Sequence, residues 1–122
     1  MKNNGRVLIV STDGLQRDLI LVSLRRMGFT CISCDQPEAV KRLLEEEQPA
    51  VLILDTFLHG ANGLDLLADL QGETGLGETK VILISAMGFP ETVRRSKELG
   101  ASDFLVKPVD LAVLVERIRR LV

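Results

Sequence analysis

Polar side chains follow four of the short aliphatic runs in this chain, each at the residue where the run stops. They are Ser11-Thr12-Asp13, Asp55, Ser85 and Lys107. A carboxylate can take up a phosphoryl group as an acyl phosphate, a hydroxyl can bond one phosphoryl oxygen, and a lysine can neutralise another. If the four groups meet in space, their types indicate phosphoryl chemistry centred on Asp55.

The elements that must position these groups can be read from the hydrophobic pattern. Residues 51–54 are four consecutive aliphatics without polar alternation, which is typical of a strand buried on both faces of a parallel sheet. The pattern predicts strands at 6–10, 29–33, 51–55, 80–84 and 102–106. It predicts helices at 15–27, 35–47, 64–70, 90–99 and 110–121.

Five strands alternating with five helices favour an α/β fold, a three-layer doubly wound (βα)5 sandwich with a five-stranded parallel sheet. Parallel strands present their carboxyl ends at one edge, and open α/β sheets keep their chemistry in the crevice there. We therefore expect the four polar groups to gather at that edge.

Three helices carry more specific expectations. In the first, Leu15, Leu19 and Val22 recur at helical spacing beside Ile20, Leu24 and Met27, which predicts a wide apolar face. The second has the pattern of a capped start, with Asp35 as the cap and Pro37 in the first turn. The helix at 90–99 has few apolar residues and a basic side, so we expect it to be weakly anchored.

Composition limits the function classes. At 122 residues, with 46% hydrophobic and 26% charged residues, the chain is expected to form one globular domain over 1–122. The net charge of -2 gives no electrostatic footprint for nucleic acid. No apolar run is long enough for a membrane span and the start lacks a secretory signal, so we expect a cytoplasmic protein without membrane contact.

Two other motifs could suggest chemistry. Cys31 and Cys34 form a C-x-x-C pair, but zinc would need two more soft ligands and the only histidine is His59, so we favour two reduced thiols over a metal or redox site. The glycine-rich loop at 71–79 precedes a strand and lacks the phosphate-binding loop pattern, which argues against a nucleotide site.

As a set, these features resemble the receiver domain of bacterial two-component response regulators over essentially the whole chain. The matching features are Asp55 followed eight residues later by Gly63, Ser85-Ala86, Gly100-Ala101 and Lys107-Pro108. The resemblance implies a strand order of 2-1-3-4-5 and a signalling domain in place of an enzyme. It further implies a phosphoacceptor Asp55, fed by a sensor histidine kinase or phosphotransfer protein and acting on an output domain or effector.

The resemblance also assigns roles to other residues. Ser85 is implied to bind the phosphoryl group, Lys107 to supply its counter-charge through a turn with a cis Lys107-Pro108 bond, and Phe104 to be the aromatic switch residue. Mg2+ is implied to be held by Asp55, the backbone carbonyl of Phe57 and, weakly, Asp13.

The acidic pair that the family usually carries after its first strand is missing, because those positions are Ser11 and Thr12. Hydroxyls supply no charge to offset Mg2+. Two hypotheses follow: a working receiver that is phosphorylated on Asp55, and a degenerate receiver that acts as a phosphorylation-independent protein-interaction module. Flavin or mononucleotide binding is a third, disfavoured by Asp13 at the first turn and by the absence of Trp and Tyr.

Overall fold

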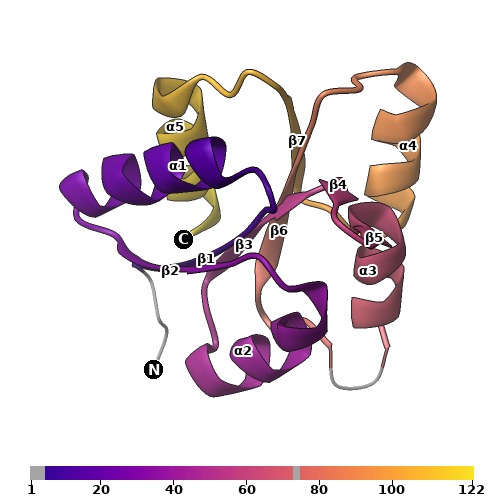
Figure 1. Cartoon of the computed structure of the whole chain (residues 1–122), viewed down its shortest axis with the longest axis horizontal. Helices are drawn as coiled ribbons and strands as arrows, with labels where there is room; N and C mark the ends of the chain where they lie inside the picture. The colour runs from indigo at the N-terminus through magenta and orange to yellow at the C-terminus, as the bar shows by residue number, and fades with distance from the viewer. Residues whose placement is uncertain (1–4, 73–74) are drawn as a thin grey trace.

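A five-stranded parallel sheet forms the centre of the computed structural model, which describes residues 5–72 and 75–122 (Figure 1). Its strands lie in the order β2-β1-β3-β6-β7. Their bounds are Arg6–Val10 for β1, Thr30–Cys34 for β2, Val51–Asp55 for β3, Lys80–Ser85 for β6 and Asp103–Val106 for β7. Counted along this sheet in chain order, the arrangement is 2-1-3-4-5, so the predicted α/β fold and strand order are confirmed.

Helices cover both faces of the sheet. On one face lie α1 (Gly14–Arg26) and α5 (Leu111–Leu121), and on the other lie α2 (Val40–Glu47), α3 (Gly63–Leu70) and α4 (Pro90–Glu98) (Figure 1). Every residue of β3 is buried, because successive side chains of this central strand point alternately into the two helical layers. Ile53 packs on the α1–α5 side, whereas Leu52 and Leu54 pack on the other.

The apolar face of α1 is narrower than the sequence suggests. Ile20 and Leu24, one helical turn apart, are buried against the sheet. Leu15, Leu19 and Val22 are exposed, with Leu15 76% accessible. These three residues lie on a different arc of the helix from the buried pair, so only part of the apolar stripe meets the core.

The start of the second helix also differs from the prediction. Asp35 is not its cap; a 3-10 turn, η1 (Pro37–Ala39), precedes α2, and Gln36 occupies the cap position without a side-chain hydrogen bond. A proline at the first helical position fixes φ but donates no N–H, and a tight 3-10 turn is a common way for such a start to form.

A short hairpin lies in the loop between β3 and α3. In it β4 (Phe57–Leu58) pairs antiparallel with β5 (Ala61–Asn62). Gly60 takes a positive φ of 75° in the turn, a conformation that favours glycine. The hairpin holds the residues after Asp55 close to the sheet edge.

The two cysteines lie on opposite faces of β2 and are both free. Cys31 packs into the α1–α5 core and Cys34 into the other core, as expected for residues three apart on a strand. Burial raises the pKa of the Cys31 thiol above its usual value, and the nearby Arg25 partly offsets this effect. The pair therefore cannot form one metal or redox site.

Among the described residues, no helix is both long enough and apolar enough to cross a membrane.

Candidate functional site

Asp55 ends β3 with its side chain almost completely buried at 1% accessibility. One carboxylate oxygen, Oδ2, lies 2.6 Å from Lys107 Nζ and accepts a hydrogen bond from Ser11 Oγ at 3.1 Å. The other, Oδ1, accepts one from the backbone N–H of Phe57 at 3.1 Å. A buried carboxylate is costly without partners, and here both oxygens are bonded by groups of the chain itself.

Lys107 reaches Asp55 from the end of β7. Its backbone N–H donates to the carbonyl of Ser85 at 2.8 Å, which fixes the turn against β6. The Lys107-Pro108 bond is cis, as the resemblance implies. The Lys107 side chain is 19% accessible, and its ammonium group contacts the buried carboxylate of Asp55.

Ser85 ends β6 and is 2% accessible. Its Oγ accepts a hydrogen bond from Thr56 Oγ1 at 2.7 Å and another from the backbone N–H of Met87 at 3.0 Å. Sequence reasoning did not identify Thr56. Its position directly after Asp55 is the only signal, and this signal does not reveal that its hydroxyl turns to Ser85.

The β1 side of the crevice carries two hydroxyls, at Ser11 and Thr12, in place of the acidic pair usual in the family that the sequence resembles. Ser11 Oγ binds Asp55, and Thr12 Oγ1 accepts a hydrogen bond from the backbone N–H of His59 at 3.3 Å. The His59 side chain itself is exposed. Ser11 therefore links the end of β1 to β3, and Thr12 links it to the loop that follows β3.

Asp13 is the N-cap residue of α1. Its Oδ1 accepts a hydrogen bond from the backbone N–H of Gln16 at 3.2 Å, as a helix N-cap does. β1 pairs in continuous register with β2 and β3 as far as Val10, and Asp13 lies three residues beyond that point. In this geometry the exposed Asp13 carboxylate stabilises a helix end.

The donor set for a divalent cation is consequently sparse. Within residues 5–72 and 75–122, no group of three or more His, Cys, Asp or Glu side chains is arranged to hold a metal ion. Asp55 is the only buried carboxylate among the described residues, and Lys107 already lies against it. Mg2+ prefers several hard oxygen ligands, with carboxylates to offset its charge, so these residues fit it poorly.

Gly63 packs against the backbone of the acceptor residue. A Cβ at this position would lie 2.1 Å from the carbonyl oxygen of Asp55, and the Gly63 N–H donates to the carbonyl of Thr56 at 2.7 Å. The neighbouring Asn62 caps α3 by accepting a hydrogen bond from the Leu64 N–H at 2.7 Å. Only glycine permits so close an approach between α3 and β3.

Phe104 lies in β7 and is partly buried on the α2–α3 side of the sheet. It pairs with Leu83 of β6, and Ser85 pairs with Val106 two residues further along each strand. The predicted switch residues thus occupy adjacent strands.

The parallel sheet and the groups at its carboxyl edge define a receiver domain. Residues 7–119 match the response regulator receiver domain family, and the chain belongs to it. Receiver domains are signalling domains of two-component phosphorelays, and they generally bind Mg2+ at an acidic pocket.

Curated relatives share moderate identity with the chain. The phosphate regulon transcriptional regulatory protein PhoB of Pseudomonas aeruginosa is 26% identical over 113 residues, covering 93% of this chain and 49% of that protein. The transcriptional regulatory protein CseB of Streptomyces coelicolor is 31% identical over 119 residues, covering 98% and 50%. The chain therefore spans about half the length of these two relatives.

Among solved structures, the BeF3-activated N-terminal receiver domain of Klebsiella pneumoniae RstA is similar, with a TM-score of 0.86 and 25% identity. The match covers 95% of this chain and 97% of that one. Vibrio cholerae chemotaxis protein CheY4 gives a TM-score of 0.88 at 19% identity, covering 97% and 98%, which shows the shared fold.

Proposed function

We propose that this chain is a phosphoacceptor receiver whose Asp55 takes a phosphoryl group from the phosphohistidine of a sensor histidine kinase or phosphotransfer protein. The observation that carries the proposal is the buried Asp55 carboxylate held 2.6 Å from Lys107 at the carboxyl end of β3. The modified domain changes a protein-interaction face and acts on an output domain or effector. It works in the cytoplasm and does not contact nucleic acid itself.

The residues around Asp55 have separate tasks in this proposal. A carboxylate oxygen forms the new O–P bond as the N–P bond to histidine breaks. Lys107 offsets the charge on the acyl phosphate, because its ammonium already lies beside Oδ2. Ser85 leaves its hydrogen bond with Thr56 to bind a phosphoryl oxygen, and Phe104 on the adjacent strand adjusts as Ser85 moves.

Any Mg2+ would be held weakly, by Asp55, the backbone carbonyl of Phe57 and Asp13. It would supply charge neutralisation on the phosphoryl oxygens when bound. Asp13 reaches this role only by giving up its hydrogen bond to the N–H of Gln16, so the helix cap competes with the metal. Lys107 is the cation that the chain itself places against Asp55.

A second candidate function is favoured by the β1 edge. Ser11 and Thr12 are neutral, and both hydroxyls are already bonded within the fold. A degenerate receiver of this kind would signal through protein contacts alone and would keep the same interaction face without phosphorylation.

Phosphoryl uptake separates the two functions. The purified protein would be incubated with acetyl phosphate, and separately with beryllofluoride, each with millimolar Mg2+, and followed by intact mass spectrometry and amide NMR. We expect a mass increase of one phosphoryl group that is absent from Asp55→Asn, and amide shifts around Ser85. An unmodified protein with an unchanged spectrum in both reagents would favour the degenerate receiver.

A further inference from the structure

Ser11 is the residue on the β1 side of the crevice that contacts Asp55 directly. Its side chain is fully buried, and its hydroxyl donates to Asp55 Oδ2 at 3.1 Å. The same hydroxyl oxygen accepts a hydrogen bond from the backbone N–H of Asp13 at 3.1 Å. A serine hydroxyl has one proton to donate and two lone pairs that accept. Because the N–H of Asp13 occupies a lone pair, the proton of Ser11 is directed at the carboxylate.

The main chain of Ser11 is fixed by two further hydrogen bonds. Its N–H donates to the carbonyl of Cys34 at 3.1 Å, and its carbonyl accepts a hydrogen bond from Arg17 Nη1 at 3.0 Å. A donor that is already held in place needs no reorganisation when charge develops beside it, and such donors stabilise charge well in a buried site. Ser11 is therefore a preorganised donor to the carboxylate of Asp55.

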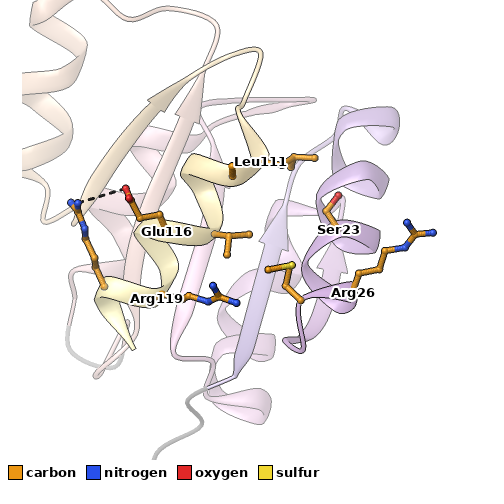
Figure 2. Close-up of a pocket in the computed structure, with 9 residues that line it drawn as sticks. Ser23, Arg26, Leu111, Glu116 and Arg119 are labelled. Atoms are coloured by element: carbon orange, nitrogen blue, oxygen red, sulfur yellow. Dashed lines mark ion pairs between the residues drawn. The ribbon is translucent and has the colours of Figure 1, made fainter.

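Lys107 is the cation in direct contact with Asp55, at 2.6 Å. Arg17 donates to the main chain at the end of β1, one step removed from the carboxylate. By contrast, Figure 2 shows Arg26 and Arg119 at a groove between α1 and α5. Arg26 is the last residue of α1, and at 1.5 Å per residue it lies about 18 Å along the helix from its start beside β1. The basic residues of that groove therefore do not serve the Asp55 site.

The formal charges of the site balance without a divalent cation. A dication held by an acidic pair adds no net charge to a pocket, and the hydroxyls of Ser11 and Thr12 without a dication add none either. Asp55 and Lys107 cancel each other in both cases. Mg2+ placed against the two hydroxyls would instead leave its charge uncompensated in a largely buried site, which is costly. The residue types at the β1 edge therefore suit a site that works without Mg2+.

We propose that Ser11 takes the place of the divalent cation, so that Asp55 accepts a phosphoryl group without Mg2+; the proposal rests on the phosphoacceptor function. Oδ2 is bonded by Lys107 and Ser11, whereas Oδ1 accepts a bond from the neutral N–H of Phe57. Oδ1 is therefore the better nucleophile and attacks the phosphorus. The new O–P bond forms as the bond between phosphorus and the leaving group of the donor breaks, and the leaving group departs with its electron pair.

The chain's own donors receive the charge that this transfer moves. Oδ2 becomes the carbonyl oxygen of the acyl phosphate and keeps its bond to Ser11. Lys107 turns from Oδ2 to a phosphoryl oxygen and offsets its charge. Thr12 Oγ1 accepts a hydrogen bond from the N–H of His59 and retains its own proton, which it donates to a second phosphoryl oxygen.

Phosphoryl uptake with and without Mg2+ tests the proposal. The purified chain is incubated with acetyl phosphate in excess EDTA and, in parallel, in millimolar Mg2+, and the phosphorylated fraction is followed by intact mass spectrometry. We expect the two rates to agree within about threefold. Beryllofluoride binding, measured by amide NMR in buffer freed of magnesium and calcium, gives an equilibrium readout. We expect it to saturate at the same concentration whether or not Mg2+ is added back.

Variants at position 11 test the role of the hydroxyl. Ser11→Ala removes the donor and is expected to slow uptake in EDTA at least about tenfold. Ser11→Asp places a carboxylate beside Asp55, so uptake is expected to be slow in EDTA and to rise at least about tenfold when Mg2+ is added. Ser33→Ala removes a hydroxyl from the edge strand β2 and is expected to change neither rate.

Three outcomes would overturn the proposal. Uptake in Mg2+ but not in EDTA would overturn it and leave the phosphoacceptor function standing, whereas no uptake under either condition would overturn both. An unchanged rate for Ser11→Ala in EDTA would show that Ser11 does not replace the cation. Circular dichroism of each variant distinguishes a loss of uptake from a loss of fold, and if Ser11→Asp does not fold, the comparison of Ser11→Ala with Ser33→Ala decides.

Discussion

The two sides of the crevice at the carboxyl edge of the sheet differ in the charge of their side chains. On the β3–β7 side a buried carboxylate faces an ammonium group at 2.6 Å. On the β1 side, two hydroxyls make neutral hydrogen bonds to Asp55 and to the loop after it. Lys107 is therefore the cation in contact with Asp55, whereas the bonds that Ser11 and Thr12 make on the opposite side are neutral; the guanidinium on that side, Arg17, donates to the carbonyl of Ser11 at 3.0 Å.

The largest effect should come from removing the cation in contact with Asp55. Lys107→Met keeps the side-chain length but leaves Asp55 as a buried carboxylate without a cation. We expect a loss of about 3 kcal/mol in the free energy of unfolding, measured by urea denaturation with circular dichroism. In an Asp55→Asn background the same change should cost much less, because no charge remains to be balanced. Equal costs in the two backgrounds would mean that Lys107 stabilises the fold by packing alone.

A carboxylate introduced on the β1 side should give that side a charged ligand for Mg2+, which its hydroxyls do not provide. Thr12→Asp is expected to raise Mg2+ affinity at least about tenfold, since it adds a charged hard ligand opposite Asp55. Isothermal titration of Mg2+ measures the change, with Thr12→Asn as the neutral control of similar size. Unchanged affinity would show that position 12 does not face the ion, and would leave Asp13 as the ligand position.

The hydroxyl of Ser11 should contribute less than Lys107. Ser11→Ala removes one hydrogen bond to Asp55 Oδ2 in a fully buried position. We expect a loss of about 1 kcal/mol in the free energy of unfolding. Thr12→Ala serves as the control, because its hydroxyl is more exposed and accepts a longer bond of 3.3 Å. A cost as large as that of Lys107→Met would contradict the larger contribution of Lys107.

The smallest loss of stability is expected from removing the Thr56 hydroxyl, which bonds Ser85. Thr56→Val removes the hydroxyl that donates to Ser85 Oγ and preserves the side-chain shape. We expect a loss of about 0.5 kcal/mol and amide NMR shifts centred on Met87, whose N–H bonds the same oxygen. Shifts that spread to β1 would mean that the two walls are coupled through Ser85.

The acceptor side was largely predictable from sequence. Asp55 and Ser85 each follow an uninterrupted aliphatic run, and Lys107 follows a shorter apolar one that includes Phe104. Parallel strands bring their carboxyl ends to one edge, so the convergence follows from the strand pattern. The hydrogen bond from Thr56 to Ser85 was not predictable, because it depends on the path of the β4–β5 hairpin. Sequence periodicity reveals no such loop geometry.

Helix α1 shows a similar limit to what the sequence can predict. Leu15, Leu19 and Val22 have helical spacing, which correctly predicts a helix, but spacing does not say which arc of an apolar helix meets the sheet. That choice depends on how α1 docks beside α5.

The close approach of Gly63 to Asp55 has a mechanical consequence. A carbonyl oxygen that leaves no room for a methyl group places the first turn of α3 in direct contact with the end of β3. α4 has a single fully buried residue, Ser96, and carries no comparable lock. We therefore expect that a motion relaying the state of Asp55 to the surface displaces α4 more easily than α3, because α4 buries fewer side chains.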